Sequence, residues 1–182
     1  MTPPTHTDPP APLAWGGRVS ATFRAAVRSM ARRLQVQPDW LMACIAFETG
    51  ATFRPDIRNA AGSGAVRLIQ FMPATAAALG TSTARLEALT AEQQLVYVEQ
   101  YLRPWAKRLH DLADVYMAIL WPAAIGRADD AVLFRREDPR RPKLYIQNAG
   151  LDYNRDGVIT KAECAARVHR MLDLGLRAEN VG

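Results

Sequence analysis

The strongest constraint on the fold is an almost uninterrupted apolar segment, WLMACIAFET, at residues 40–49. Pro38 and Asp39 precede it and are typical of the first turn of a helix, and Gly50 follows it where a left-handed residue would end the helix. A helix that is apolar nearly all round has to be buried among other elements. The sequence therefore predicts a central helix whose last turn carries an acidic residue, Glu48.

The segments around this helix also have helical signatures. Ser20 can cap a helix that runs to about residue 36, with apolar residues spaced by four, three and four positions. Further helices are predicted over residues 73–80, from the Thr90 capping box onward, over 112–121 and over about 161–174. No run of alternating apolar and polar residues predicts a strand. We therefore expect an all-α fold with irregular segments at 51–67 and 123–148.

The chain of 182 residues is long enough for one domain with a small appendage. We expect a flexible, proline-rich arm at 1–17, a main helical domain at 18–147 and a C-terminal unit at 148–182. The arm has neither the basic start nor the apolar stretch of a secretory signal, and no apolar run is long enough to form a transmembrane segment.

The formal net charge of +5 suggests affinity for an acidic partner. The basic residues are scattered and have no aromatic interleaving or nucleic-acid motif around them, so we expect no nucleic-acid partner and a monomer. The two cysteines, Cys44 and Cys164, have no metal-ligand spacing. Two buried free thiols are expected, and a long-range disulfide is the alternative.

Glu48 is the first candidate catalytic residue. Ile45, Ala46 and Phe47 precede it, and a carboxyl group in such apolar surroundings is poorly hydrated, which raises its pKa. Cleavage of a glycosidic bond needs a proton donor of this kind on the leaving oxygen. The alternative is a glutamate that reaches water at the end of a helix, with no catalytic role.

The stretch that follows favours the catalytic interpretation. FETGATFRPDIRNAAGSGAVRLIQFMPATAAALG resembles the signature of the soluble lytic transglycosylase family, within the goose-type lysozyme superfamily. The resemblance covers about residues 35–127. The matching positions are Glu48, Thr49, Gly50, Pro55, Gly64, Leu68, Ile69, Gln70, Phe71, Met72, Pro73, Thr75 and Ala76.

The resemblance implies a lysozyme-like catalytic domain at 18–147 that acts on bacterial peptidoglycan. Glu48 would protonate the β-1,4 bond between N-acetylmuramic acid and N-acetylglucosamine, and the muramyl C6 hydroxyl would then attack to give a 1,6-anhydro product. No cofactor is implied for catalysis. Thr49, Gln70 and Met72 match family residues around the substrate, although packing or loop stabilisation is the alternative for each.

Two departures from the family pattern bear on the chemistry. Arg67 stands where the family commonly has glycine, and Trp121 stands where it has the tyrosine of a Tyr-Asn-Ala-Gly element. Trp121 could still stack on a sugar, and Tyr116 could supply the hydroxyl that an indole lacks, or could be core. Simple hydrolysis, with a carboxylate such as Asp56 positioning water, remains an alternative outcome.

A second constellation, DYNRDGVITKAE, lies near the C-terminus. It matches a twelve-residue EF-hand calcium loop, including the glycine at the sixth position, Gly157. The predicted ligands are Asp152, Asn154, Asp156, Val158 through its backbone carbonyl, Thr160 and Glu163. The alternative is an acidic turn before a helix. Because no second EF-hand is present, we expect a structural Ca²⁺ that ties the C-terminal helix to the main domain.

These features leave several functions open. A peptidoglycan-cleaving lytic transglycosylase is the first, and a hydrolytic muramidase or a chitinase of the same fold is a variant of it. A catalytically degenerate wall-binding protein and a calcium-dependent interaction module are the others. The compact size, basic charge and missing export signal favour a phage or prophage lysin, made in the host cytoplasm and released to the cell wall or carried on a virion.

Overall fold

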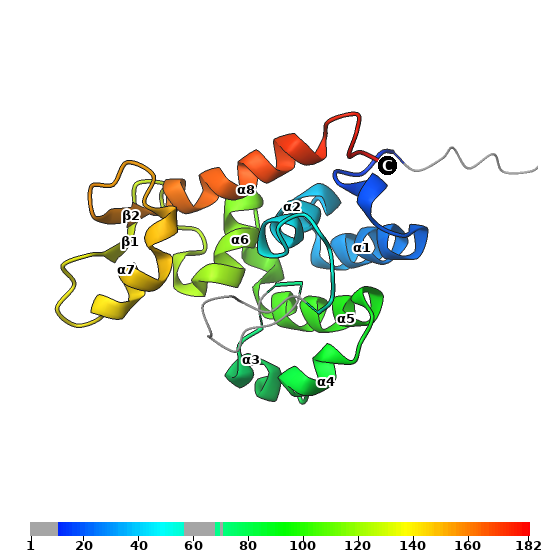
Figure 1. Ribbon diagram of the computed structural model, residues 1–182, viewed down its shortest axis with the longest axis horizontal. Coiled ribbons are helices and arrows are strands. Elements are labelled where there is room, and N and C mark those ends of the chain that lie inside the picture. The colour runs from blue at the N-terminus through cyan, green and yellow to red at the C-terminus, as the bar shows by residue number, and fades with distance from the viewer. Residues whose placement is uncertain (1–10, 57–67, 70) are drawn as a thin grey trace, which may run out of the picture.

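The computed structural model describes residues 11–56, 68–69 and 71–182, and this part of the chain is mainly helical (Figure 1). The helices are α1 (Ala21–Leu34), α2 (Pro38–Glu48), α3 (Pro73–Ala78), α4 (Thr83–Glu87), α5 (Ala91–Leu102), α6 (Leu112–Leu120), α7 (Pro142–Asn148) and α8 (Lys161–Gly175). The strands are β1 (Val132–Arg135) and β2 (Val158–Thr160). Short 3-10 helices cover Gly16–Arg18, Arg103–Arg108, Pro122–Ala124 and Ala149–Leu151.

Helix starts follow the capping chemistry that the sequence predicts. The Ser20 hydroxyl accepts a hydrogen bond from the backbone N–H of Phe23 at the start of α1. Thr90 and Gln93 form a reciprocal capping box at the start of α5, as expected. The predicted helices at α1, α2, α3, α5, α6 and α8 are confirmed, whereas α4 and α7 were not foreseen.

The apolar helix α2 lies at the centre of the core, as predicted. Its residues 41–46 are all buried. It packs against α1, α6 and α8, and α8 runs along it toward the C-terminus (Figure 1). This packing fixes the end of α2, which carries Glu48, among three other helices.

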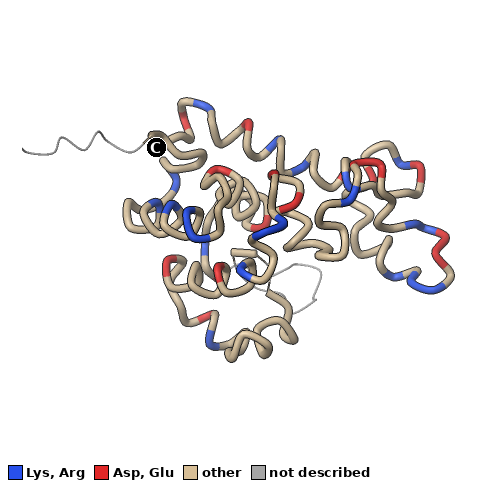
Figure 2. The backbone as a smooth tube through the Cα atoms, turned by 180° about the vertical axis from the view of Figure 1, so that it is seen from behind, with Lys and Arg blue, Asp and Glu red and all other residues tan. Residues whose placement is uncertain are grey.

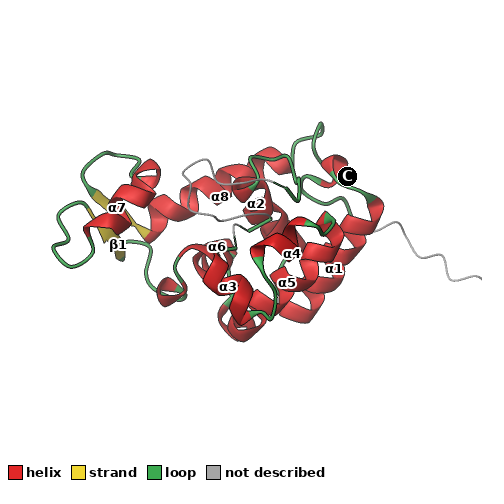
Figure 3. Ribbon diagram, turned by 60° about the horizontal axis from the view of Figure 1, so that its bottom comes forward, coloured by secondary structure: helices red, strands yellow, loops and turns green. Residues whose placement is uncertain are grey.

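The mainly helical architecture agrees with the expected fold class, and a small antiparallel sheet is an addition that the sequence did not predict. β1 pairs with β2, with Val132 opposite Thr160 and Phe134 opposite Ile159. Both strands are too short for alternation to be recognised, and what stabilises them is the burial of Phe134 and Ile159. The sheet and α7 lie together at one end of the helical body (Figure 3).

The predicted flexible arm is wrong for its last residues. Leu13, Ala14, Trp15 and Gly16 are buried. The Leu13 N–H donates to the carbonyl of Gly182, and the Trp15 N–H donates to that of Gly175, each at 2.9 Å. The indole N–H of Trp15 donates to the carbonyl of Met171. Residues 13–17 are thus tied to the C-terminal segment, and residues 1–10 lie outside the described residues.

Two further expectations can be compared with the structure. Cys44 and Cys164 are both buried and free, as expected. Within residues 11–56, 68–69 and 71–182, none of the helices combines the length and the hydrophobicity that crossing a membrane requires.

Candidate functional site

Glu48 is the last residue of α2 and is only partly exposed to solvent. The ring of its neighbour Phe47 packs edge-to-face on Tyr116 of α6, with 5.4 Å between ring centroids. Burial raises the pKa of Glu48 from an ordinary 4.5 to about 7. A carboxyl group with this pKa is present in both protonation states near neutral pH, which is what one residue acting as acid and then as base requires.

Two buried groups lie close enough to this carboxyl for its charge to affect their pKa values. Burial raises the pKa of Tyr116 well above its ordinary value, and the charge of Glu48 raises it further. The thiol of Cys44, on α2, has its pKa raised by burial and then by Glu48. Cys164, on α8, contributes to the shift at Tyr116. Helices α2 and α6 thus bring an acid, a phenol and a thiol together, and the second thiol, on α8, adjoins the phenol.

Thr49 lies directly after the acid, but its hydroxyl is committed to the protein. It is 2% exposed, donates to the carbonyl of Ile45 at 2.7 Å and accepts from the N–H of Phe53 at 3.2 Å. These bonds leave the hydroxyl little access to a ligand. The bonds favour the alternative role of stabilising the turn after Glu48, and the substrate contact stays a prediction.

That turn has an unusual backbone. Gly50, Ala51 and Phe53 have φ values of 57°, 60° and 54°, in the left-handed region that favours glycine. Two of the three are not glycine, so the turn needs compensating contacts. The ring of Phe53 is buried against Trp15 and Phe23, with 6.2 Å between centroids in each pair. Packing in the core thereby holds the strained segment beside the acid.

Of the remaining residues of the transglycosylase-like motif, only some lie in the part of the chain that the structure describes. Gln70 and Arg67 lie outside the described residues, so the predictions made for them stay predictions. Met72 is 47% exposed at the start of α3 and is accessible to a ligand. Asp56 forms an exposed ion pair with Arg54 at 2.6 Å. The hydrogen bond from Arg54 holds the pKa of Asp56 below its usual value.

Trp121 caps the C-terminus of α6, and its described neighbours belong to the region that the sequence left irregular. Its ring packs edge-to-face on Phe134 of β1 at 5.3 Å, and the Arg141 guanidinium lies 5.8 Å from its centroid. A pocket of about 540 Å³ opens here. The residues that line it are Trp121, Arg140, Arg141, Pro142, Lys143 and Leu144.

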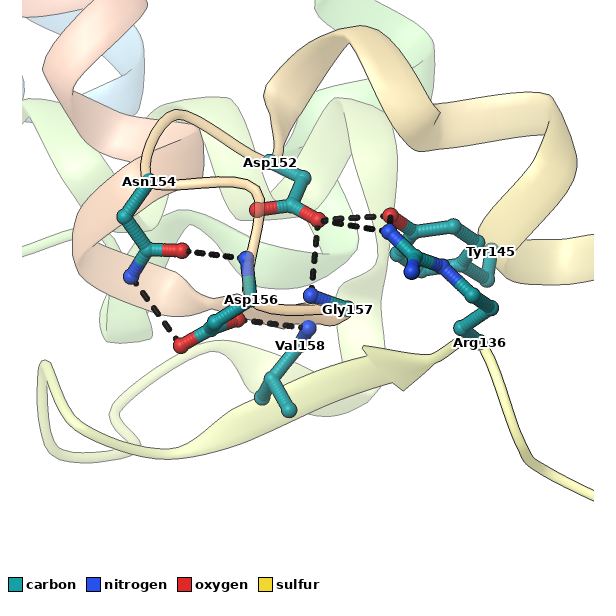
Figure 4. A network of polar contacts seen from close by, with 7 residues as sticks. All are labelled: Arg136, Tyr145, Asp152, Asn154, Asp156, Gly157 and Val158. Atoms are coloured by element: carbon teal, nitrogen blue, oxygen red, sulfur yellow. Dashed lines mark hydrogen bonds and ion pairs between the residues drawn. The ribbon is translucent and has the colours of Figure 1, made fainter.

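The second candidate site is the loop at residues 152–163, part of which is shown in Figure 4. Oδ2 of Asp152 accepts from the hydroxyl of Tyr145 at 2.5 Å and from the N–H of Gly157 at 3.0 Å. Oδ1 of Asn154 accepts from the N–H of Asp156. Gly157 has φ 87°, the left-handed conformation expected at the sixth position of the loop.

Two carboxylate oxygens of this loop are directly relevant to calcium binding. Oδ1 of Asp152 and Oε1 of Glu163 are buried and have no hydrogen-bond partner. They belong to the first and twelfth positions, and a buried carboxylate oxygen without a partner is costly unless a cation or water satisfies it. The oxygen atoms that the loop offers are therefore of the type that a calcium ion prefers.

The carboxylates of the loop are nevertheless not gathered around a common centre. Among the described residues, no group of three or more His, Cys, Asp and Glu side chains is arranged to hold a metal ion. The carboxylate of Asp156 instead accepts from the N–H of Val158 and from the Asn154 amide. Thr160 shares a capping box with Glu163 at the start of α8. Carboxylate rotation would be needed to complete a calcium shell.

The surroundings of the loop include features that the sequence did not reveal. Helix α7 and the turn Ala149–Leu151 precede the loop and α8 follows it, so the loop is flanked by helical segments on both sides. β2 lies within the loop and pairs with β1 in place of a second calcium-binding hand.

Lys161, at the tenth position of the loop, makes a buried ion pair that was not predicted. Its ammonium donates to Asp114 on α6 at 2.8 Å and to the carbonyl of Arg127 at 2.9 Å. Burial alone would raise the pKa of Asp114, but the hydrogen bonds from Lys161 and from the N–H of Gly126 outweigh it and hold that pKa below its usual value. A lysine at this position looks like a surface residue in the sequence, so no signal pointed to the pair.

Comparison of the chain with known proteins gives no match, either to a family model or, at a significant level, to a curated protein.

Proposed function

We propose that the protein cleaves the glycan strands of bacterial peptidoglycan, with Glu48 as general acid and then general base. The observation that carries the proposal is a carboxyl group at the end of the central apolar helix, with a pKa raised to about 7 by burial. The resemblance of residues 48–76 to the lytic transglycosylase signature supplies the substrate class.

The proposed chemistry uses one carboxyl group twice. Protonated Glu48 donates its proton to the glycosidic oxygen as the bond to the muramyl anomeric carbon breaks. The resulting carboxylate then accepts the proton of the muramyl C6 hydroxyl, whose oxygen attacks the anomeric carbon and closes the 1,6-anhydro ring. If water attacks instead, the product is a reducing muramyl end and the enzyme is a hydrolytic muramidase.

The surroundings of Glu48 suit this double role. A protonated thiol and a protonated phenol carry no charge, and the pKa values of Cys44 and Tyr116 are both raised, so these two neighbours are neutral near neutral pH. A carboxyl group whose pKa is about 7 can release its proton to a substrate and take one back at a modest cost in free energy.

The test is mass spectrometry of the soluble products from purified peptidoglycan and from chitin oligomers. Wild-type protein is compared with Glu48→Gln and with Glu179→Gln, which removes the same charge from an exposed position. Anhydromuropeptides from wild type and Glu179→Gln, but not from Glu48→Gln, are expected. Equal activity of Glu48→Gln, or no product from any variant, would overturn the proposal, and the second result favours a wall-binding protein without turnover.

We also propose that residues 152–163 bind a structural calcium ion. The supporting observation is the pair of buried, unpartnered oxygens on Asp152 and Glu163. When bound, the ion would neutralise the loop carboxylates and hold them in one arrangement. The ion would stabilise the fold and take no part in the chemistry, because none of its proposed ligands belongs to the group formed by Glu48, Tyr116 and Cys44.

Calcium binding is tested by calorimetric titration of the chelator-treated protein and by thermal unfolding with calcium or chelator. Glu163→Gln is the informative variant, since the Gln carbonyl oxygen can still accept the capping bond from the Thr160 N–H while a bidentate carboxylate is lost. Binding with a raised Tm is expected in wild type and should be lost in Glu163→Gln. Both should be kept in Glu137→Gln, which removes one carboxylate from an exposed position outside the loop. Identical unfolding of wild type with calcium and with chelator contradicts a structural calcium.

A further inference from the structure

The pocket beside Trp121 is built from segments for which the resemblance gives no account. Trp121 forms one wall at the end of α6, and residues 140–144, at the start of α7, form the other. Its volume of about 540 Å³ lies in the range of small-molecule sites. The pocket can therefore hold one sugar or a short peptide.

The charges on this wall are held in place by the turn that precedes α7. Oδ1 of Asp138 accepts from the backbone N–H of Arg140 at 2.9 Å and of Arg141 at 3.1 Å. Oδ2 of the same residue lies 3.5 Å from the Arg141 guanidinium, which also lies over the Trp121 ring. Arg141 is thus positioned by one carboxylate and one aromatic face.

The other two cations are available to a ligand. Arg140 and Lys143 are exposed, and neither makes an ion pair with another residue in the described part of the chain. Lys and Arg residues are otherwise spread along the chain (Figure 2), whereas three of them line this single pocket beside an indole. Such a lining suits a ligand that has an apolar or ring face and at least one negative charge.

Helix α6 links the pocket to Glu48. Trp121 caps the C-terminus of this helix, and Tyr116, whose pKa the charge of Glu48 raises, lies within it. One element of the fold therefore carries both the indole of the pocket and the phenol that adjoins the proposed acid.

We propose that this pocket binds the carboxylate-bearing peptide stem of the muramyl residue, with Arg140 and Lys143 pairing with its carboxylates and Trp121 contacting its apolar part. The inference rests on the proposed function, because the stem is attached to the strand that Glu48 would cleave. A single-stranded nucleic acid is a weaker candidate, since its recognition uses successive stacking aromatics along an open basic groove, and this pocket has one indole.

The test measures binding and not turnover, so that its failure and the failure of the proposed function can be told apart. N-acetylmuramyl-L-alanyl-D-glutamate is titrated calorimetrically at low salt, beside its diamide, in which both stem carboxylates are amidated. The proteins are wild type, Arg140→Ala/Lys143→Ala, and Arg170→Ala/Arg177→Ala. The last variant removes two exposed cations of α8 and the segment after it, which matches the change in net charge.

Wild type and the α8 variant are expected to bind the acid more tightly than the diamide. The Arg140/Lys143 variant should bind the acid about tenfold more weakly, since it loses two exposed charge pairs, each of which contributes modestly. Added salt should reduce the preference for the acid. Trp121→Ala should weaken both ligands.

Two results would overturn the inference. In the first, the two double variants lose affinity equally, which means that only net charge matters. In the second, wild type does not distinguish the acid from the diamide, or binds neither. An eight-residue oligothymidylate is titrated in parallel, and if it binds more tightly than the acid and loses affinity only in the Arg140/Lys143 variant, the pocket is a nucleic-acid site.

Discussion

Glu48→Gln should make the protein more stable at alkaline pH, although it removes the proposed catalytic group. In the folded state burial raises the pKa of Glu48 to about 7, from the 4.5 that it has when hydrated. The folded state therefore holds this proton more tightly than the unfolded state does. The stability that the neutral carboxyl contributes is fully present below about pH 4.5 and is lost as pH rises through about 7.

The magnitude follows from the two pKa values. A tenfold change in an equilibrium constant corresponds to about 1.4 kcal/mol, so the ionised group destabilises the fold by about 3 kcal/mol at high pH. About 2.5 kcal/mol of this appears between pH 5 and pH 8. Partial exposure of the side chain makes these figures upper values. Gln has the shape of the neutral acid and does not ionise, so the variant should escape this loss.

The assay is urea unfolding followed by far-UV circular dichroism at several pH values between about 5 and 8. The gain of Glu48→Gln over wild type should be small at the acidic end and should grow to about 2 kcal/mol or more at the alkaline end. Glu179→Gln, at an exposed site, is the control for the loss of one carboxylate. A gain that is the same at every pH, or absent, would refute the argument that burial raises the pKa of Glu48.

Two further substitutions test the packing around the site. Lys161→Met should destabilise the fold by about 3–5 kcal/mol, because it leaves the buried carboxylate of Asp114 without its partner. Adding Asp114→Asn should recover much of the loss. Equal urea midpoints for Lys161→Met and wild type would contradict the ion pair. Gly175→Ala should cost about 1–3 kcal/mol, since an added Cβ would lie 2.4 Å from the Trp15 ring; a Tm unchanged from wild type would show that Trp15 is not packed there.

The sequence predicted the elements whose evidence is local. The apolar helix over residues 38–48, the Ser20 and Thr90 caps, and the stripe of Phe23, Val27 and Met30 each follow from neighbours within one or two turns. The same holds for the glycine turn of the loop at residues 152–163, where Gly157 has the expected positive φ. Local patterns therefore identified most of the helices and the position of the candidate acid.

What the sequence missed depends on contacts between distant segments. Trp15 is buried because its ring meets Gly175, which lies 160 residues away. The strands β1 and β2 exist because they pair with each other and bury Phe134 and Ile159. None of these contacts has a periodic or spacing signature.

The buried ion pair of Lys161 and Asp114 relates the two candidate sites to each other. Lys161 belongs to the loop at residues 152–163 and begins α8, and Asp114 belongs to α6, the helix that carries Tyr116. Cys164, one turn after Lys161, lies close enough to Tyr116 to influence its pKa.

A calcium ion bound only to the folded loop would stabilise the native state by about 2.7 kcal/mol at a concentration one hundred times its Kd. Through α8 and α6, that stabilisation would extend to the helices that bury Glu48. Such an ion would keep the helices that bury Glu48 folded without contacting the substrate, and chelation would then affect activity through unfolding and not through the chemical step.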